Sequence, residues 1–97
     1  MIVVRNVFKL KFGKAKEVKV LMQEAVSINK KNGINDVRVL TDITGPSYTM
    51  VFETTHESLA VFESKIHTIL GSPEWGKMYE KFIPFVDSAY REIFTIV

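Results

Sequence analysis

A single amide on an otherwise apolar strand face is the first group in this chain that could do chemistry. Residues 2–12 alternate between two faces, and Asn6 shares the apolar face with Val4 and Phe8. A buried amide needs hydrogen-bond partners, so Asn6 either pins a neighbouring backbone group or faces a bound molecule. The sequence leaves both interpretations open.

Two aromatic residues, four positions apart, form a second candidate. Trp75 and Tyr79 fall on one face of a helical stretch, where the Tyr79 phenol could relay a proton to a ligand beside the indole. Aromatic residues at this spacing are more often core packing, and that alternative also stays open.

Glu63 and His67 are the remaining pair of side chains that could do chemistry. They lie four residues apart on one helical stretch, close enough to touch as an acid–base pair or as half of a metal site. Metal sites need three or four ligands, and no second ligand pair is visible. We therefore expect an ordinary surface pair and no metal, with His56 solvated in a turn before the helix.

Composition excludes several classes of function. The chain has 97 residues, no cysteine and a formal net charge of +2, so thiolate catalysis and zinc–thiolate sites are excluded. Five lysines cluster near the start, at positions 9, 11, 14, 16 and 19. We interpret them as a solvated face and expect no nucleic-acid partner, because no aromatic stacking motif accompanies them. No signal peptide or membrane-spanning run is visible, and we expect a cytoplasmic protein.

Local signals set the order of the elements. The expected order is strand 2–12, helix 14–31 ending at Asn32-Gly33, strand 36–43, strand 48–55, a helix ending at Gly71, a helix from Ser72-Pro73-Glu74 to Pro84, and strand 88–96. Thr54 and Glu57 match a capping box that would open the first of the two later helices.

This β-α-β-β-α-β order predicts a ferredoxin-like α+β domain over residues 1–97. Its sheet has four antiparallel strands, with the helices on one face. Several strands are apolar on both faces, as in Val3 and Val7 against Val4 and Phe8. A sheet that is apolar on both faces needs a second cover, so we expect a homodimer whose sheets pack face to face.

The chain resembles a known superfamily in three places. The segment Val4–Ala15, the segment Ser72–Trp75 with the aromatic helix after it, and Arg91–Phe94 resemble the dimeric α+β barrel proteins, in particular their NIPSNAP-like and antibiotic-biosynthesis-monooxygenase-like branch. The resemblance implies a homodimer with a ligand pocket between helices and sheet in each subunit. The wider superfamily includes cofactor-free quinone-forming monooxygenases, haem-degrading monooxygenases, isomerases and simple ligand binders.

The resemblance also implies which residues reach the pocket. In haem-degrading relatives an Asn in this strand context faces the cofactor, and the residue nearest the position of their iron-ligating His is Tyr79. Because that His is missing there, we expect no cofactor. We predict that a small aromatic or hydrophobic ligand contacts Asn6, Phe8, Phe62, Trp75 and Tyr79, and that Asn6 and Tyr79 carry any catalysis.

Three functions follow as alternatives. The first is a homodimeric ligand-binding protein that acts as a cofactor-independent monooxygenase. The second is a non-catalytic binding or sensing module, and the third is a structural dimer. A haem-degrading monooxygenase is the weakest alternative. The face of Arg91 cannot be assigned from the pattern.

Overall fold

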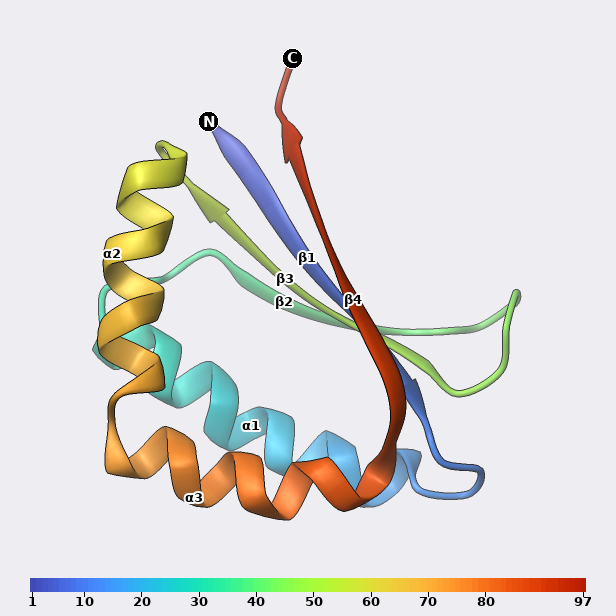
Figure 1. The fold of residues 1–97 in the computed structure, drawn as a ribbon. Coiled ribbons are helices and arrows are strands. Elements are labelled where there is room, and N and C mark those ends of the chain that lie inside the picture. The colour runs from blue at the N-terminus through green and yellow to red at the C-terminus, as the bar shows by residue number, and fades with distance from the viewer.

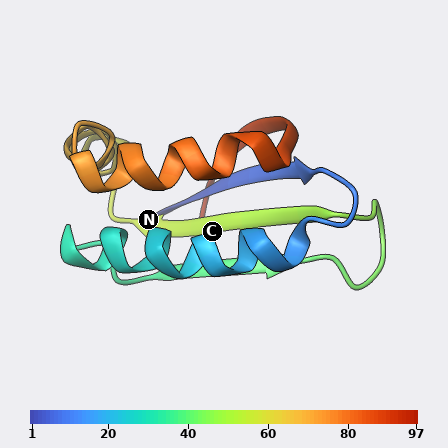
Figure 2. The same cartoon turned by 90° about the horizontal axis from the view of Figure 1, so that it is seen from below.

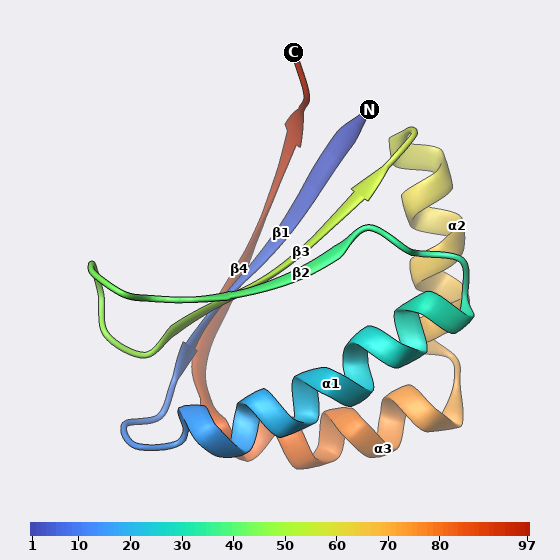
Figure 3. The same cartoon turned by 180° about the vertical axis from the view of Figure 1, so that it is seen from behind.

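A computed structural model describes residues 1–97 and confirms the expected order of elements. The elements are β1 (Ile2–Leu10), α1 (Ala15–Lys31), β2 (Val37–Thr41), β3 (Thr49–His56), α2 (Leu59–Leu70), α3 (Pro73–Phe82), a 3-10 turn (Ile83–Phe85) and β4 (Val86–Thr95). The strands form one antiparallel sheet in the order β2-β3-β1-β4. All three helices lie on one side of this sheet (Figures 1 and 3).

The helix ends follow their local sequence signals. Ser72 caps α3, because its hydroxyl accepts a hydrogen bond from the Trp75 amide, and Pro73 occupies the first helical position. After α1, Gly33 adopts a φ of +80°, the left-handed conformation that glycine adopts at low cost. The helices α1 and α3 then run side by side beneath the sheet (Figure 2).

Two local predictions were wrong. The expected capping box does not form: Thr54 and His56 continue β3, and Ser58 caps α2 by accepting a hydrogen bond from the Val61 amide. Antiparallel pairing with β1, where His56 lies opposite Ile2, extends the strand past the predicted cap. The alternation over residues 2–12 also predicts Phe12 on the apolar face with Phe8, but β1 ends at Leu10 and Phe12 is 86% exposed, with its ring beside that of Tyr48.

The core lies between the helices and the inner face of the sheet. It is one cluster of 12 buried residues, contributed by every layer: Leu10, Val18, Leu21, Met22, Ala25, Ile28, Ile34, Met50, Phe52, Ile69, Met78 and Phe82. Even-numbered residues of β1 and β3 point into this cluster, as the alternation predicts.

The outer face of the sheet is uncovered by any helix. A charged row crosses it, in which the buried Glu53 carboxylate pairs with Arg5 at 3.2 Å and also with Arg38. Beside this row lies an apolar one, formed by the register partners Leu40, Val51, Val7 and Tyr90. Leu40 and Tyr90 are 38% and 59% exposed, so this face retains uncovered apolar area. No helix is long and apolar enough to cross a membrane.

Candidate functional site

A cavity of about 800 Å³ lies between the helices and the inner face of the sheet. This volume falls within the range of natural small-molecule sites. Hydrophobic side chains make up 14 of its 20 lining residues. The five residues predicted to contact a ligand, namely Asn6, Phe8, Phe62, Trp75 and Tyr79, all line it.

Asn6 meets the side chain of Arg91 at this cavity. The two residues are register partners on β1 and β4, and Arg91 Nε–H donates to Asn6 Oδ1 over 2.8 Å. The Asn6 oxygen thus accepts from a side chain on β4, which is far away in the sequence but adjacent in the sheet, and not from a neighbouring backbone group. The Asn6 amide nitrogen makes no hydrogen bond within the chain, so its N–H groups remain available to a ligand.

Aromatic rings of α3 form one wall. The Trp75 and Tyr79 rings stack with centroids 6.3 Å apart, and Tyr79 also contacts Phe82 edge-on. Phe82 in turn meets Phe8 of β1 in a T-shaped pair at 5.0 Å. Phe82 is buried, whereas Tyr79 is 41% exposed. The wall is therefore anchored in the core at Phe82 and open at Tyr79, whose hydroxyl has no partner in the chain.

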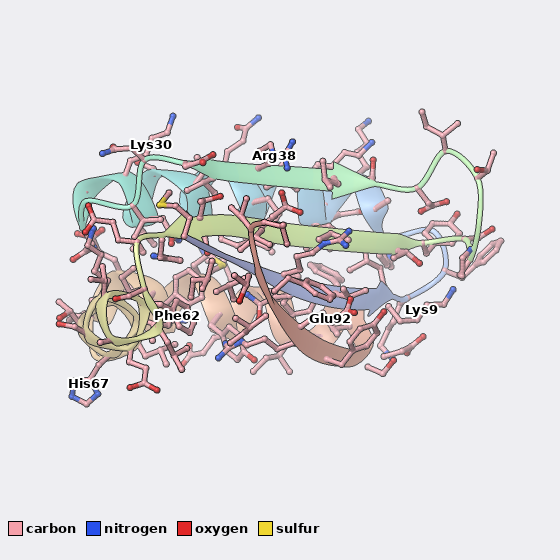
Figure 4. The ribbon with its side chains drawn as sticks, turned by 90° about the horizontal axis from the view of Figure 1, so that it is seen from above. Lys9, Lys30, Arg38, Phe62, His67 and Glu92 are labelled. Atoms are coloured by element: carbon pink, nitrogen blue, oxygen red, sulfur yellow. The ribbon has the colours of Figure 1, made fainter.

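Phe62 of α2 lines the cavity and also contacts Arg91, the hydrogen-bond partner of Asn6. Its ring is buried, and the Arg91 guanidinium carbon lies 5.4 Å from the ring centroid, within range of a cation–π interaction. In Figure 4, Phe62 lies on the inward side of α2, whereas His67 projects outward. Residues only five positions apart on α2 thus lie on its cavity side and on its solvent side.

His56 was expected to be solvated, and that prediction was wrong. Its side chain is buried against the Phe62 ring, with centroids 5.0 Å apart, and its Nε2 lies 2.8 Å from Thr54 Oγ1. Burial lowers the pKa of the His56 imidazole, and the positive charge of Lys65 lowers it further. His56 does not line the large cavity, although Thr54 does.

Glu63 and His67 stay outside the site. Both side chains are exposed on α2, and no hydrogen bond or ion pair joins them. No group of three or more His, Cys, Asp or Glu side chains is gathered in an arrangement that could hold a metal ion.

Sequence reasoning did not place four polar residues of the cavity lining: Asn29, Thr54, Glu80 and Arg91. Asn29 is buried near the end of α1, and its amide nitrogen donates to the Ala25 carbonyl over 2.8 Å, a partner within its own helix. Arg91 becomes a site residue only through its register with Asn6. That register depends on pairing between the first and last strands, which no local pattern specifies.

Comparison with solved structures assigns the fold. Atu4242 from Agrobacterium tumefaciens, a NIPSNAP family protein of unknown function, superposes with a TM-score of 0.90 at 19% identity, over 100% of this chain and 94% of that one. A NIPSNAP domain protein from Burkholderia xenovorans gives 0.86 at 16% identity, over 100% and 95%. A proposed antibiotic biosynthesis monooxygenase from Deinococcus radiodurans gives 0.75 at 13% identity, over 100% and 93%.

These neighbours confirm the predicted resemblance at the level of the fold. The chain has the ferredoxin-like α+β fold of NIPSNAP-family and antibiotic-biosynthesis-monooxygenase-like proteins. No family model matches the sequence, and no curated protein matches it. Because one fold hosts many chemistries, function must be argued from the cavity itself.

Proposed function

We propose that this protein, with the fold shared by NIPSNAP-family and monooxygenase-like structures, binds a small aromatic ligand in the cavity between helices and sheet. The observation that carries the proposal is the composition of the lining. A wide apolar surface with stacked rings at Trp75 and Tyr79 surrounds a few polar groups, above all Asn6. That combination is typical of small-molecule sites, where the apolar area binds and the polar groups orient.

The chemistry that we propose for this site is oxygenation of a phenol without a cofactor. The phenol supplies four electrons to O₂; one oxygen atom becomes the new quinone carbonyl and the other leaves as water. The free amide N–H groups of Asn6 would hold the phenolate oxygen, and the unpartnered Tyr79 hydroxyl would move a proton. A solved structure of the same fold described as an antibiotic biosynthesis monooxygenase supports this version.

Oxygen uptake with a panel of phenols and quinols tests the proposal. We expect uptake above background with at least one compound, and at least about a tenfold loss of rate in Tyr79→Phe and in Asn6→Ala. Tyr48→Phe is the matched control, because Tyr48 lies outside the cavity lining. Background uptake with every compound would contradict the oxygenase version.

A second candidate function is ligand binding without turnover. One observation favours it: the cavity lining contains no histidine, and its single carboxylate, that of Glu80, is exposed. The lining therefore offers no buried imidazole or carboxyl group for acid–base catalysis. Recovery of a co-purified ligand unchanged after incubation in air would support this candidate, and its conversion would contradict it.

We also propose that two copies pair through the outer faces of their sheets. The exposed apolar row through Leu40 and Tyr90 supports this assembly, because a partner sheet would remove that area from water. Light scattering is expected to give twice the chain mass of 11.1 kDa. Leu40→Lys should weaken the dimer, whereas Val20→Lys, an exposed apolar position on α1, should leave it unchanged. A wild-type monomer at micromolar concentration would contradict the proposal.

A further inference from the structure

We infer that the ligand is an aromatic carboxylate and that Arg91 binds its carboxylate group. This inference rests on the proposed ligand-binding function and specifies the chemical class of the ligand. The evidence for it is the set of contacts made by Arg91, a residue of β4 that lines the cavity.

Arg91 has unused hydrogen-bonding capacity. An arginine side chain carries five N–H donors, and the structure engages one of them, the Nε–H that donates to Asn6. The remaining four, on the two terminal nitrogens, have no partner in the chain. A planar carboxylate is the group that accepts two parallel hydrogen bonds from such a guanidinium.

Arg91 is also the one arginine without an ion pair. Arg5 and Arg38 both contact the Glu53 carboxylate on the outer face of the sheet. Arg91 lies on the inner face and contacts no carboxylate. Its charge is therefore available at the edge of an apolar cavity, where an anion would neutralise it.

Neighbouring side chains hold the guanidinium in place. Asn6 fixes its Nε edge, and Phe62 lies against it at 5.4 Å from guanidinium carbon to ring centroid. Arg91 is exposed, but the Phe62 ring lies against one face of its guanidinium, so its free N–H groups are held in a fixed orientation beside the cavity. In this arrangement Asn6 is a positioning residue for Arg91 as well as a polar contact of the cavity.

The charge of the lining selects a monoanion. Arg91 is the only basic residue among the 20 that line the cavity, whereas a phosphate dianion is usually held by several donors or cations. One carboxylate, Glu80, also lines the cavity, but its side chain is exposed and forms no ion pair with Arg91. A ligand with a single carboxylate and a flat apolar body matches this set of groups.

A pair of probes that differ in one charge tests the inference. Biphenyl-4-carboxylate and biphenyl-4-carboxamide have the same shape, and biphenyl-4-methylamine reverses the charge. Trp75 is the only tryptophan and lines the cavity, so its fluorescence reports occupancy directly. We expect the carboxylate to bind about tenfold or more tightly than the carboxamide, and the amine to bind more weakly than either.

Two variants assign the preference to Arg91. Arg91→Gln should bring the carboxylate and carboxamide affinities to within about twofold of each other, because the carboxylate loses more binding than the carboxamide. Arg91→Lys keeps the charge without the planar fork and should retain part of the preference. Arg38→Gln is the control, because it removes the same charge from the opposite face of the sheet, labelled in Figure 4.

The failures of the two proposals are distinguishable. Equal wild-type affinities for carboxylate and carboxamide would overturn the role of Arg91 but leave an aromatic-binding cavity. A preference for the amine would also overturn it and would point to Glu80. Absence of binding by all three probes would overturn both proposals. If Arg91→Gln does not fold, the wild-type preference and the Arg91→Lys result still decide the question.

Discussion

The hydrogen bond from Arg91 Nε–H to Asn6 Oδ1, 2.8 Å long, joins residues 85 positions apart in the chain. It links the first strand to the last across the inner face of the sheet, where both side chains line the cavity. The bond gives the single amide of β1 a partner and leaves its N–H groups free. It also brings the one unpaired arginine to the apolar cavity.

Phe62 should contribute substantially to the stability of the fold. Its ring is 5% exposed and contacts both His56 and Arg91. Phe62→Ala should lower the free energy of unfolding by about 3 kcal/mol, through lost burial and the enlarged cavity. Phe12→Ala, at a ring that is 86% exposed, should change it by less than about 0.5 kcal/mol in urea titrations. Similar values for the two variants would show that Phe62 is not packed as described.

Stability should depend on pH through His56. Its pKa in the folded state is lowered below the ordinary value of 6.5, so the unfolded chain binds a proton more readily than the folded one. The associated stability is fully present above about pH 6.5, is lost as pH falls toward the lowered folded-state pKa, and is constant below it.

The difference in unfolding free energy between wild type and His56→Gln should therefore shrink on acidification from about pH 7.5. Ser64→Ala, at an exposed position on α2 without an ionisable group, serves as the control, and its difference from wild type should not vary with pH. A difference for His56→Gln that does not vary between neutral and acidic pH would contradict the buried environment of this imidazole.

Glu53 should stabilise the outer face of the sheet. Its carboxylate is buried and contacts two guanidinium groups, those of Arg5 and Arg38. Glu53→Gln leaves both cations without a carboxylate and should cost about 1–2 kcal/mol, less than for a fully buried pair because both arginines reach solvent. Glu74→Gln, which breaks an exposed pair with Lys31, should cost less than about 0.5 kcal/mol in the same titration. Equal costs would argue that solvent screens the Glu53 contacts.

Haem should not bind in the cavity with an imidazole ligand. Both histidines lie outside the lining, His56 buried beside it and His67 exposed on α2. Hemin mixed with the purified protein is expected to show an unshifted Soret band. A shifted band that disappears in Tyr79→Phe would contradict this expectation and would assign the iron to the phenolate.

Regular periodicity made most of the fold predictable. The alternation in β1 placed Asn6 on the inner face, and the spacing of Trp75 and Tyr79 placed both on one side of α3. The Ser72-Pro73 start of α3 needed only local chemistry, and the structure shows the expected cap. In each of these cases, neighbouring residues were enough to determine the outcome.

Predictions failed where the structure depends on pairing between strands that are far apart in the sequence. Thr54 and Glu57 fit a helix cap as well as a strand end, and pairing of β3 with β1 selected the strand. The same pairing buried His56. Predicting the position of Arg91 requires the β1–β4 register, and predicting the cavity requires the placement of α2. Local periodicity specifies neither of them.

The most direct test of the proposed site is a two-dimensional ¹H–¹⁵N NMR titration with biphenyl-4-carboxylate. We expect saturable shifts at the Asn6 side-chain amide, the Trp75 indole N–H and the Arg91 Nε–H, with Arg38 on the opposite face unmoved. A titration that leaves the Asn6 and Trp75 signals in place, or that moves only signals of the outer face, would contradict a ligand site in this cavity.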